Sequence, residues 1–209
     1  MYSPPYFRFN NQQEIKAFLE EHNFGLLTIA PAKNEVYFAH IPFEFRFDND
    51  TVTLLGHVSR RNPISQFFND DFEACAVIQS QHHHYISSEW YTKPSAPTWN
   101  YQAVHLFGRI QVLNETDLKF HLNNMVNHFE GKYNNQKLKM NDIPTHLMNE
   151  MISEIVGFSI KASRVEAVNK MSQNRDKQSL DNIDNALEKL NSPESTGVSK
   201  KIKQANDNH

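Results

Sequence analysis

The stretch "LLGHVSRRNP", residues 54–63, begins as an apolar strand and ends in a polar, cationic turn that a proline closes. Alternate side chains of a strand point to opposite faces, so a hydroxyl, an imidazole and a guanidinium can converge on one oxyanion there. His57, Ser59 and Arg61 point to one face, and Arg60 points to the other with Gly56 and Val58. The chain has only six glycines and neither a G-x-G-x-x-G nor a Walker-type loop, so a phosphate would be held by side chains such as these. A polar strand end with surface arginines is the alternative.

Segments with the residue pattern of strands and segments with the pattern of helices alternate unevenly on both sides of this stretch. Strands are expected at residues 24–30, 35–45, 51–58, 73–79, 83–91, 102–113 and 155–168. Helices are expected at residues 10–22, 63–71, 115–133, 144–154 and 176–190. Few of the strands alternate with helices in a βαβ order. The sequence therefore predicts a mainly β, α+β protein: an antiparallel barrel with helical decoration.

Composition narrows the class of protein. Apolar residues make up 39% of 209 residues, enough for one sizeable core, and no apolar run approaches the ~18 residues of a membrane span. The N-terminal residues show no signal-peptide pattern, and the single cysteine, Cys75, excludes an internal disulfide. We expect a cytoplasmic protein without a membrane partner.

The C-terminal part has a different composition. Residues 176–190 place four apolar side chains on one helical face: Leu180, Ile183, Leu187 and Leu190. The residues that follow contain almost no large apolar side chains and are predicted to be disordered. The expected organisation is a barrel domain at 1–170, a motif and amphipathic helix at 171–191, and a disordered tail at 192–209. Seven basic and six acidic residues from position 170 onward give no strongly basic tail for DNA.

Aromatic, hydroxyl and amide side chains gather in residues 85–105, around Pro94 and Pro97. Rings beside hydrogen-bonding groups suit a flat ligand with polar edges, which needs stacking and edge contacts. An aromatic-rich core corner or a subunit interface is the alternative.

Six motifs occur in an order and at spacings that resemble the PaiB-like proteins, which are described as FMN-binding negative transcriptional regulators. These motifs are "MYSPPYF", "FAHIPF", "GHVSRRNP", "HHYISSEWY", "PTWNYQAVHLFGRI" and "NKMSQNR". The resemblance covers about residues 1–190. It implies an FMN-binding split β-barrel, related to pyridoxamine-phosphate oxidase, that forms a homodimer with flavin sites at its interface.

The same resemblance implies a set of cofactor-binding residues. The phosphate would be held at the strand end by His57, Ser59, Arg60 or Arg61, and Asn62. The flavin ring would be lined by His40, Tyr85, Ser87, Trp90 and Tyr91, and from the partner subunit by Trp99, Asn100 and Tyr101. Lys170, Ser172, Gln173 and Asn174 form a C-terminal motif that either binds flavin or holds the last helix. One departure is Gln81–His82, where the family tends to have Gly-Pro.

That departure creates the run His82, His83, His84, of which the first and third share a strand face and resemble a chelating pair. No carboxylate stands in a recognisable motif with them, so no metal site is predicted. Haem binding is a further hypothesis, because histidine ligands are available, but the motifs of haem-binding split-barrel proteins are not evident.

The sequence leaves three function classes open. A regulator that binds FMN, with DNA as a further partner, follows from the resemblance alone, because no helix-turn-helix pattern is visible. A flavin-dependent oxidoreductase acting on a small molecule follows from the cofactor, although no residue stands out as catalytic. A barrel without a cofactor is the third alternative.

Overall fold

A computed structural model describes residues 1–9, 11–32, 34–135 and 138–206. Its contacts divide the chain into two units, each of which is described by itself. Unit 1 comprises Met1–His22, Ile78–His105 and Glu166–His209, and unit 2 comprises Asn23–Val77 and Leu106–Val165. The expected boundary at residue 170 does not coincide with this division.

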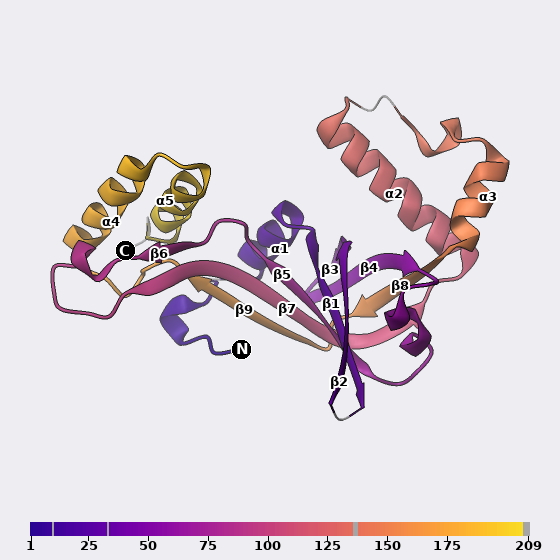
Figure 1. The fold of residues 1–209 in the computed structure, drawn as a ribbon, viewed down its shortest axis with the longest axis horizontal. Helices are drawn as coiled ribbons and strands as arrows, with labels where there is room; N and C mark the ends of the chain where they lie inside the picture. The colour runs from indigo at the N-terminus through magenta and orange to yellow at the C-terminus, as the bar shows by residue number, and fades with distance from the viewer. Residues whose placement is uncertain (10, 33, 136–137, 207–209) are drawn as a thin grey trace. The chain divides into compact units, whose positions relative to one another are not determined.

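Nine strands are paired in the described part of the chain, in the order β2-β1-β5-β7-β8-β4-β3, with β6 and β9 pairing β7 (Figure 1). The strands are β1 (Phe24–Ala32), β2 (Glu35–Pro42), β3 (Glu44–Asp48), β4 (Thr51–Ser59), β5 (Glu73–Gln79), β6 (His84–Ile86), β7 (Thr98–Val112), β8 (Ile155–Lys161) and β9 (Arg164–Lys170). Antiparallel pairing joins β1 to β2 and β5, and β4 to β3 and β8. Together with the helices this confirms the predicted α+β class.

Helices occupy the ends and connections of these strands. The α-helices are α1 (Gln12–Glu21), α2 (Glu115–Tyr133), α3 (Thr145–Ser153), α4 (Lys177–Leu190) and α5 (Pro193–Asn206). The 3₁₀ turns are η1 (Pro5–Phe7), η2 (Pro63–Phe67), η3 (Ser88–Trp90) and η4 (Met140–Asp142). Asn114 caps α2 by accepting a hydrogen bond from the backbone N–H of Asp117. None of the helices in the described ranges has both the length and the apolar character that a membrane crossing requires.

The core of unit 2 is formed by the inward faces of its strands. Phe68 meets Phe158 edge-on, with ring centroids 5.0 Å apart. Other side chains that are almost wholly buried there are Leu27, Ile29, Phe43, Leu54, Ile64, Leu106 and Ile160. Burial of each of these side chains contributes roughly 1.5–3 kcal/mol to the free energy of folding. Because a shift by one residue would move these side chains to solvent, their burial sets the register of the strands, including β4.

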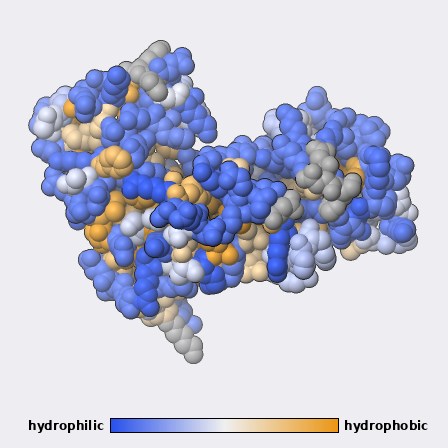
Figure 2. All heavy atoms as spheres, turned by 180° about the vertical axis from the view of Figure 1, so that it is seen from behind, coloured by the Kyte–Doolittle hydropathy of each residue, from blue (hydrophilic) through white to orange (hydrophobic). Residues whose placement is uncertain are grey.

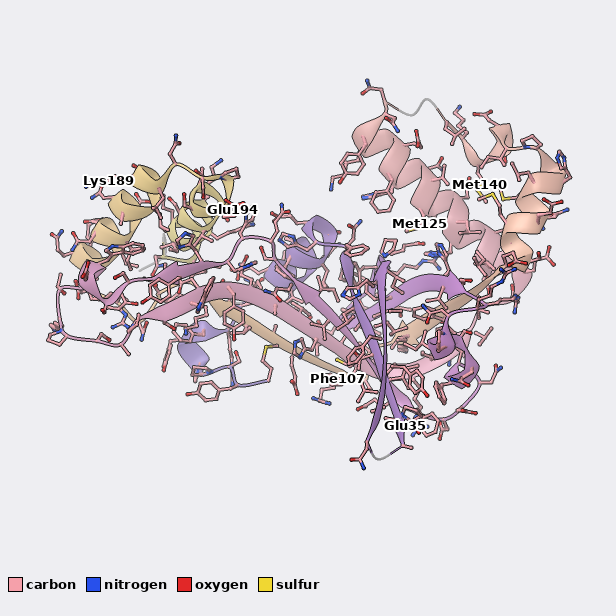
Figure 3. The ribbon with its side chains drawn as sticks, in the orientation of Figure 1. Glu35, Phe107, Met125, Met140, Lys189 and Glu194 are labelled. Atoms are coloured by element: carbon pink, nitrogen blue, oxygen red, sulfur yellow. The ribbon has the colours of Figure 1, made fainter. Side chains whose placement is uncertain are left out.

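Two helices, α2 and α3, are inserted in the chain between β7 and β8 of unit 2. Met125 of α2 and Met140 of η4 lie where α2 and η4 approach each other (Figure 3). Only three side chains of α2 and α3 are buried, namely Leu118, His121 and Ile152. The insertion therefore depends on few contacts with the sheet, of which His121 provides one.

Unit 1 has a core to which both C-terminal helices contribute, and α4 and α5 lie side by side (Figure 1). The core residues are Ile86, Tyr91, Met171, Ile183, Leu187, Val198 and Ile202. The predicted disorder is therefore wrong for Pro193–Asn206, while residues 207–209 lie outside the described residues. The physical reason is that small residues let this weakly apolar helix pack closely: a Cβ at Gly197 would lie 2.1 Å from Nδ1 of His82.

The strand predicted at residues 83–91 is also shorter than expected. It ends at Ile86, because the hydroxyl of Ser87 accepts a hydrogen bond from the N–H of Glu89 (3.3 Å) and starts η3. The helix predicted at 63–71 is the 3₁₀ turn η2, which begins with Pro63.

Candidate functional site

The end of β4 is a turn held by its own hydrogen bonds. The N–H of Asn62 donates to the carbonyl of Ser59 (2.9 Å), and the N–H of Ile64 donates to Oδ1 of Asn62 (3.2 Å). The N–H of Arg61 donates to Oγ of Ser59 (3.2 Å). The polar side chains of this turn therefore project from a fixed backbone.

The two arginines of the turn reach the end of α3, which lies in the same unit. Nε of Arg60 donates to the carbonyl of Ser153 (2.7 Å), and its backbone N–H donates to the carbonyl of Glu154 (2.8 Å). Nη2 of Arg61 pairs with the Glu154 carboxylate at 3.1 Å. The side chains of this last pair are 84% and 60% exposed, so Arg61 lies open to solvent.

The hydrogen bonds inside the turn use acceptors and leave donors. Ser59 and Asn62 accept through Oγ and Oδ1, so these bonds do not use the hydroxyl hydrogen or the amide NH₂. The bond from Arg60 uses Nε and not the two terminal nitrogens. Hydroxyl, amide and guanidinium donors at one strand end are the chemistry that a phosphate group requires, and these residues therefore fit one.

His57, two residues before this turn, faces α2. Its Nδ1 lies 3.2 Å from Nε2 of His121, and Nδ1 of His121 lies 2.8 Å from Oε2 of Glu44. Nδ2 of Asn124 donates to the other oxygen of Glu44 (3.0 Å). Residues 57, 121 and 44 thus form one chain that joins β4, α2 and β3. No sequence pattern indicated this contact, because 64 residues separate the two histidines.

The residues at both ends of this hydrogen-bonded chain, His57 and Glu44, have a lowered pKa. Burial, followed by repulsion from His121, lowers the pKa of His57 to about 4. Burial acts to raise the pKa of the Glu44 carboxyl, but hydrogen bonds from His121, Asn124 and Arg46 outweigh it and hold this pKa below its usual value. Near neutral pH the carboxyl group of Glu44 is therefore ionised and the His57 ring is neutral.

Among the ring-lining candidates, His40 lies in unit 2 and the others lie in unit 1. His40 is exposed on β2, opposite Leu26 of β1. Tyr85 of β6 and Trp99 of β7 are paired in register, with ring centroids 6.2 Å apart, and are 44% and 54% exposed. They present aromatic surface to solvent on one face of unit 1.

The remaining candidates of unit 1 lie deeper. Tyr91 is buried in the core, Trp90 packs against that core, and Ser87 caps η3. Asn100 is wholly buried and donates from Nδ2 to Oγ of Ser172 (2.8 Å). Tyr101 packs against the cluster of Phe7, Ala103 and Val168. These side chains are placed by the core of the unit.

The C-terminal motif, residues 170–175, is anchored inside unit 1. Nζ of Lys170 contacts Oγ1 of Thr98 and lies 5.6 Å from the ring centroid of Phe7. The guanidinium of Arg175 lies 3.9 Å from the Tyr91 ring centroid and donates to Oγ of Ser95 (2.8 Å).

The central residues of the same motif are engaged as well. Ser172 adopts a left-handed backbone with φ of 65°. Gln173 accepts from the N–H of Met171 (2.8 Å) and donates to the carbonyl of Asn169 (2.6 Å). Asn174 is exposed.

The three consecutive histidines point to separate surroundings. His82 packs against Gly197 of α5, His83 lies near the Trp99 ring at 6.1 Å, and Nδ1 of His84 lies 2.6 Å from the carbonyl of Tyr85. Over the described residues, no cluster of three His, Cys, Asp or Glu side chains has the geometry to hold a metal ion.

Comparison with known proteins identifies the class. Residues 1–164 match the family described as "Putative FMN-binding domain", and the chain belongs to this family. The protein is therefore an FMN-binding-domain protein, and the predicted family and cofactor are confirmed at this level.

The relatives support the same assignment. Protease synthase and sporulation protein PAI 2 of Bacillus subtilis is 32% identical over 193 residues, with 92% of each chain covered. The FAD and heme binding protein of Mycobacterium smegmatis has a similar fold, with a TM-score of 0.60 at 10% identity, over 78% of this chain and 73% of that one. The flavocytochrome Anf3 of Azotobacter vinelandii has a TM-score of 0.56 at 15% identity, over 78% and 69%. The predicted flavin-binding split-barrel fold is thereby confirmed.

Proposed function

We propose that the protein is an FMN-binding regulator of the PaiB type whose β4 end holds the phosphate of the cofactor. The observation that carries the proposal is the donor set of the turn. Ser59 and Asn62 satisfy their acceptor atoms internally and keep their donors, while Arg60 and Arg61 add two guanidinium groups. Charge-assisted hydrogen bonds from arginine to phosphate are roughly twice as strong as bonds between neutral groups.

His57 is left out of this donor set. Its Nδ1 is directed at His121, whose own Nδ1 faces the Glu44 carboxylate. The Nδ1 atom of His57 is engaged by this contact, which links β4 to α2 through His121. We therefore assign His57 to fastening α2 onto the sheet.

The ring of the flavin is assigned to aromatic surface that is not used in the cores. Within unit 2, His40 lies on an exposed strand face and is the candidate there. Within unit 1, the rings of Tyr85 and Trp99 are about half exposed, and the family resemblance assigns Trp99 to the site of the partner subunit. When bound, FMN supplies hydride and electron transfer, while the chain binds and orients it.

The homodimer is part of the same proposal. On the outward face of β1 and β2, Phe24, Val36 and Phe38 are 60%, 49% and 55% exposed. Figure 2 shows hydrophobic residues gathered in patches on the face that it presents. Exposed apolar patches mark interaction surfaces. Light scattering at micromolar concentration is expected to give twice the mass of the chain, and a monomer would count against the dimer.

Regulation and a cytoplasmic location complete the proposal. They are supported by the PaiB-type motifs, by the name of the sporulation protein it resembles, and by the single cysteine. Salt-dependent binding to a promoter fragment would support regulation. The second candidate is a flavin-dependent oxidoreductase, which the cofactor family favours. NAD(P)H oxidation by the FMN-loaded protein, without DNA binding, would decide for the enzyme.

The phosphate site is tested by its selectivity for FMN over riboflavin, which lacks only the phosphate. Replacing both arginines (Arg60→Ala with Arg61→Ala) is expected to weaken FMN binding about ten- to a hundred-fold and to spare riboflavin. Fluorescence titration measures both ligands, and circular dichroism checks the fold. Arg109→Ala, which removes an exposed arginine elsewhere in unit 2, is the matched control. An equal fall for both ligands would place the phosphate elsewhere.

A further inference from the structure

The end of α3 engages the proposed phosphate-binding turn in two different ways. Arg60 is bound by two backbone carbonyls, those of Ser153 and Glu154. Arg61 is bound by a side chain, the Glu154 carboxylate at 3.1 Å. Carbonyls of the backbone can leave only if α3 moves, whereas a carboxylate can leave by rotation of its own side chain.

The backbone around Glu154 is fixed independently of its carboxylate. Its N–H donates to the carbonyl of Met151 (3.3 Å), and its carbonyl accepts from the N–H of Arg60 (2.8 Å). Breaking the ion pair with Arg61 therefore leaves the end of α3 in place. The pair itself is weak, because an exposed pair of this kind is worth about 0–1 kcal/mol.

A carboxylate and a phosphate make the same kind of contact with a guanidinium, two oxygens facing the N–H fork. One oxygen of the Glu154 carboxylate already contacts Nη2 of Arg61, so Glu154 occupies a donor that a phosphate oxygen would otherwise use. It also adds a negative charge beside the C-terminal end of a nine-residue helix, where the helix dipole is already negative. Both effects oppose a dianionic ligand at this turn.

We propose that Glu154 is a specificity-determining residue, an internal carboxylate that competes with the FMN phosphate for Arg61. The inference rests on the proposed phosphate site. In the free protein Glu154 holds Arg61, and in the FMN complex the carboxylate rotates away and the phosphate replaces it. Glu154 therefore lowers the affinity for FMN, leaves the affinity for riboflavin unchanged, and sets the ratio between the two.

The test is Glu154→Gln, which keeps the shape of the side chain and removes its charge. FMN is expected to bind about 3- to 10-fold more tightly, from the lost competition and the lost repulsion, with riboflavin unchanged. Glu150→Gln is the matched control, because it removes the same charge one turn earlier on α3. An equal gain in Glu150→Gln would overturn the proposal, since a general field would then explain the effect.

A double-mutant cycle with Arg61→Ala separates this inference from the proposed function. The gain from Glu154→Gln is expected to disappear when Arg61 is absent. If Arg61→Ala weakens FMN binding but Glu154→Gln changes nothing, the competition is disproved and the phosphate site stands. If neither Arg61→Ala nor the double arginine variant affects FMN binding, the phosphate site is disproved and the competition with it.

Discussion

Two cationic motifs of similar composition use their side chains in opposite ways. Residues 59–62 of unit 2 place Arg61 in solvent, where an exposed carboxylate is its partner. Residues 170–175 of unit 1 bind Arg175 to Ser95 and Tyr91, and Lys170 to Thr98. The first arrangement can exchange its partner for a ligand at little cost, and the second holds the chain together. Charge and motif alone do not separate a binding site from a structural anchor, but the partners do.

The comparison is tested most strongly by removing α5, which packs on the second motif. Nδ2 of Asn206 donates to the carbonyl of Met171 (3.1 Å), and Val198 and Ile202 are buried beside that residue. Deleting residues 193–209 is expected to lower the free energy of unfolding by about 3–6 kcal/mol, because the buried contacts of Val198 and Ile202 with the core of unit 1 are lost. Urea denaturation measures it.

Point variants protect this test against a deletion that simply fails to fold. Ile202→Ala is expected to destabilise by about 2–4 kcal/mol, while Lys200→Ala on the exposed side of α5 is expected to change little. If the deletion variant and Ile202→Ala were both as stable as the wild-type protein, α5 would not support the motif.

A medium effect is expected for Arg175→Ala. The variant loses a cation–π contact and a charge-assisted hydrogen bond, together about 2–3 kcal/mol of the free energy of unfolding. The ratio of FMN to riboflavin affinity is expected to stay the same. Lys177→Ala, an 88% exposed cation two residues away, is the control for stability. A change in the affinity ratio would move the second motif into the phosphate site.

The smallest effect on stability is expected for Arg61→Ala. Only an exposed ion pair is lost, so the free energy of unfolding should change by no more than about 0.5 kcal/mol. The same variant should lower the FMN to riboflavin affinity ratio. A large loss of stability with an unchanged ratio would make residue 61 an anchor like Arg175, and the two motifs would then be alike.

Local patterns predicted most of the strand segments and the position of the cationic turn, although the single strands expected at 35–45 and 155–168 are each divided between two strands. The burial alternation of β4 and the capped start of α2 are properties of neighbouring residues, so the sequence carries them directly. The chain from His57 through His121 to Glu44 depends on three elements meeting in space, and a single sequence does not show that.

Helix α5 was missed for a different reason. Its buried residues are two serines, Ser195 and Ser199, and two apolar residues, Val198 and Ile202, so the segment resembles the composition of a disordered tail. A start signal was nevertheless present: Ser192 accepts a hydrogen bond from the N–H of Ser195 (3.1 Å), and Pro193 occupies the first helical position.

Strand β7 has a consequence for how this chain can change during evolution. Its even-numbered residues from 100 to 110 are buried on both sides of the boundary between the units at residues 105–106, and Ala103 is the one odd-numbered residue of β7 that is buried with them. Insertions are usually tolerated between structural units, because a loop absorbs them. Here one inserted residue would turn one half of the strand inside out, whereas two would restore the parity. Length variation among descendants of this sequence should therefore avoid this boundary, or occur there in pairs.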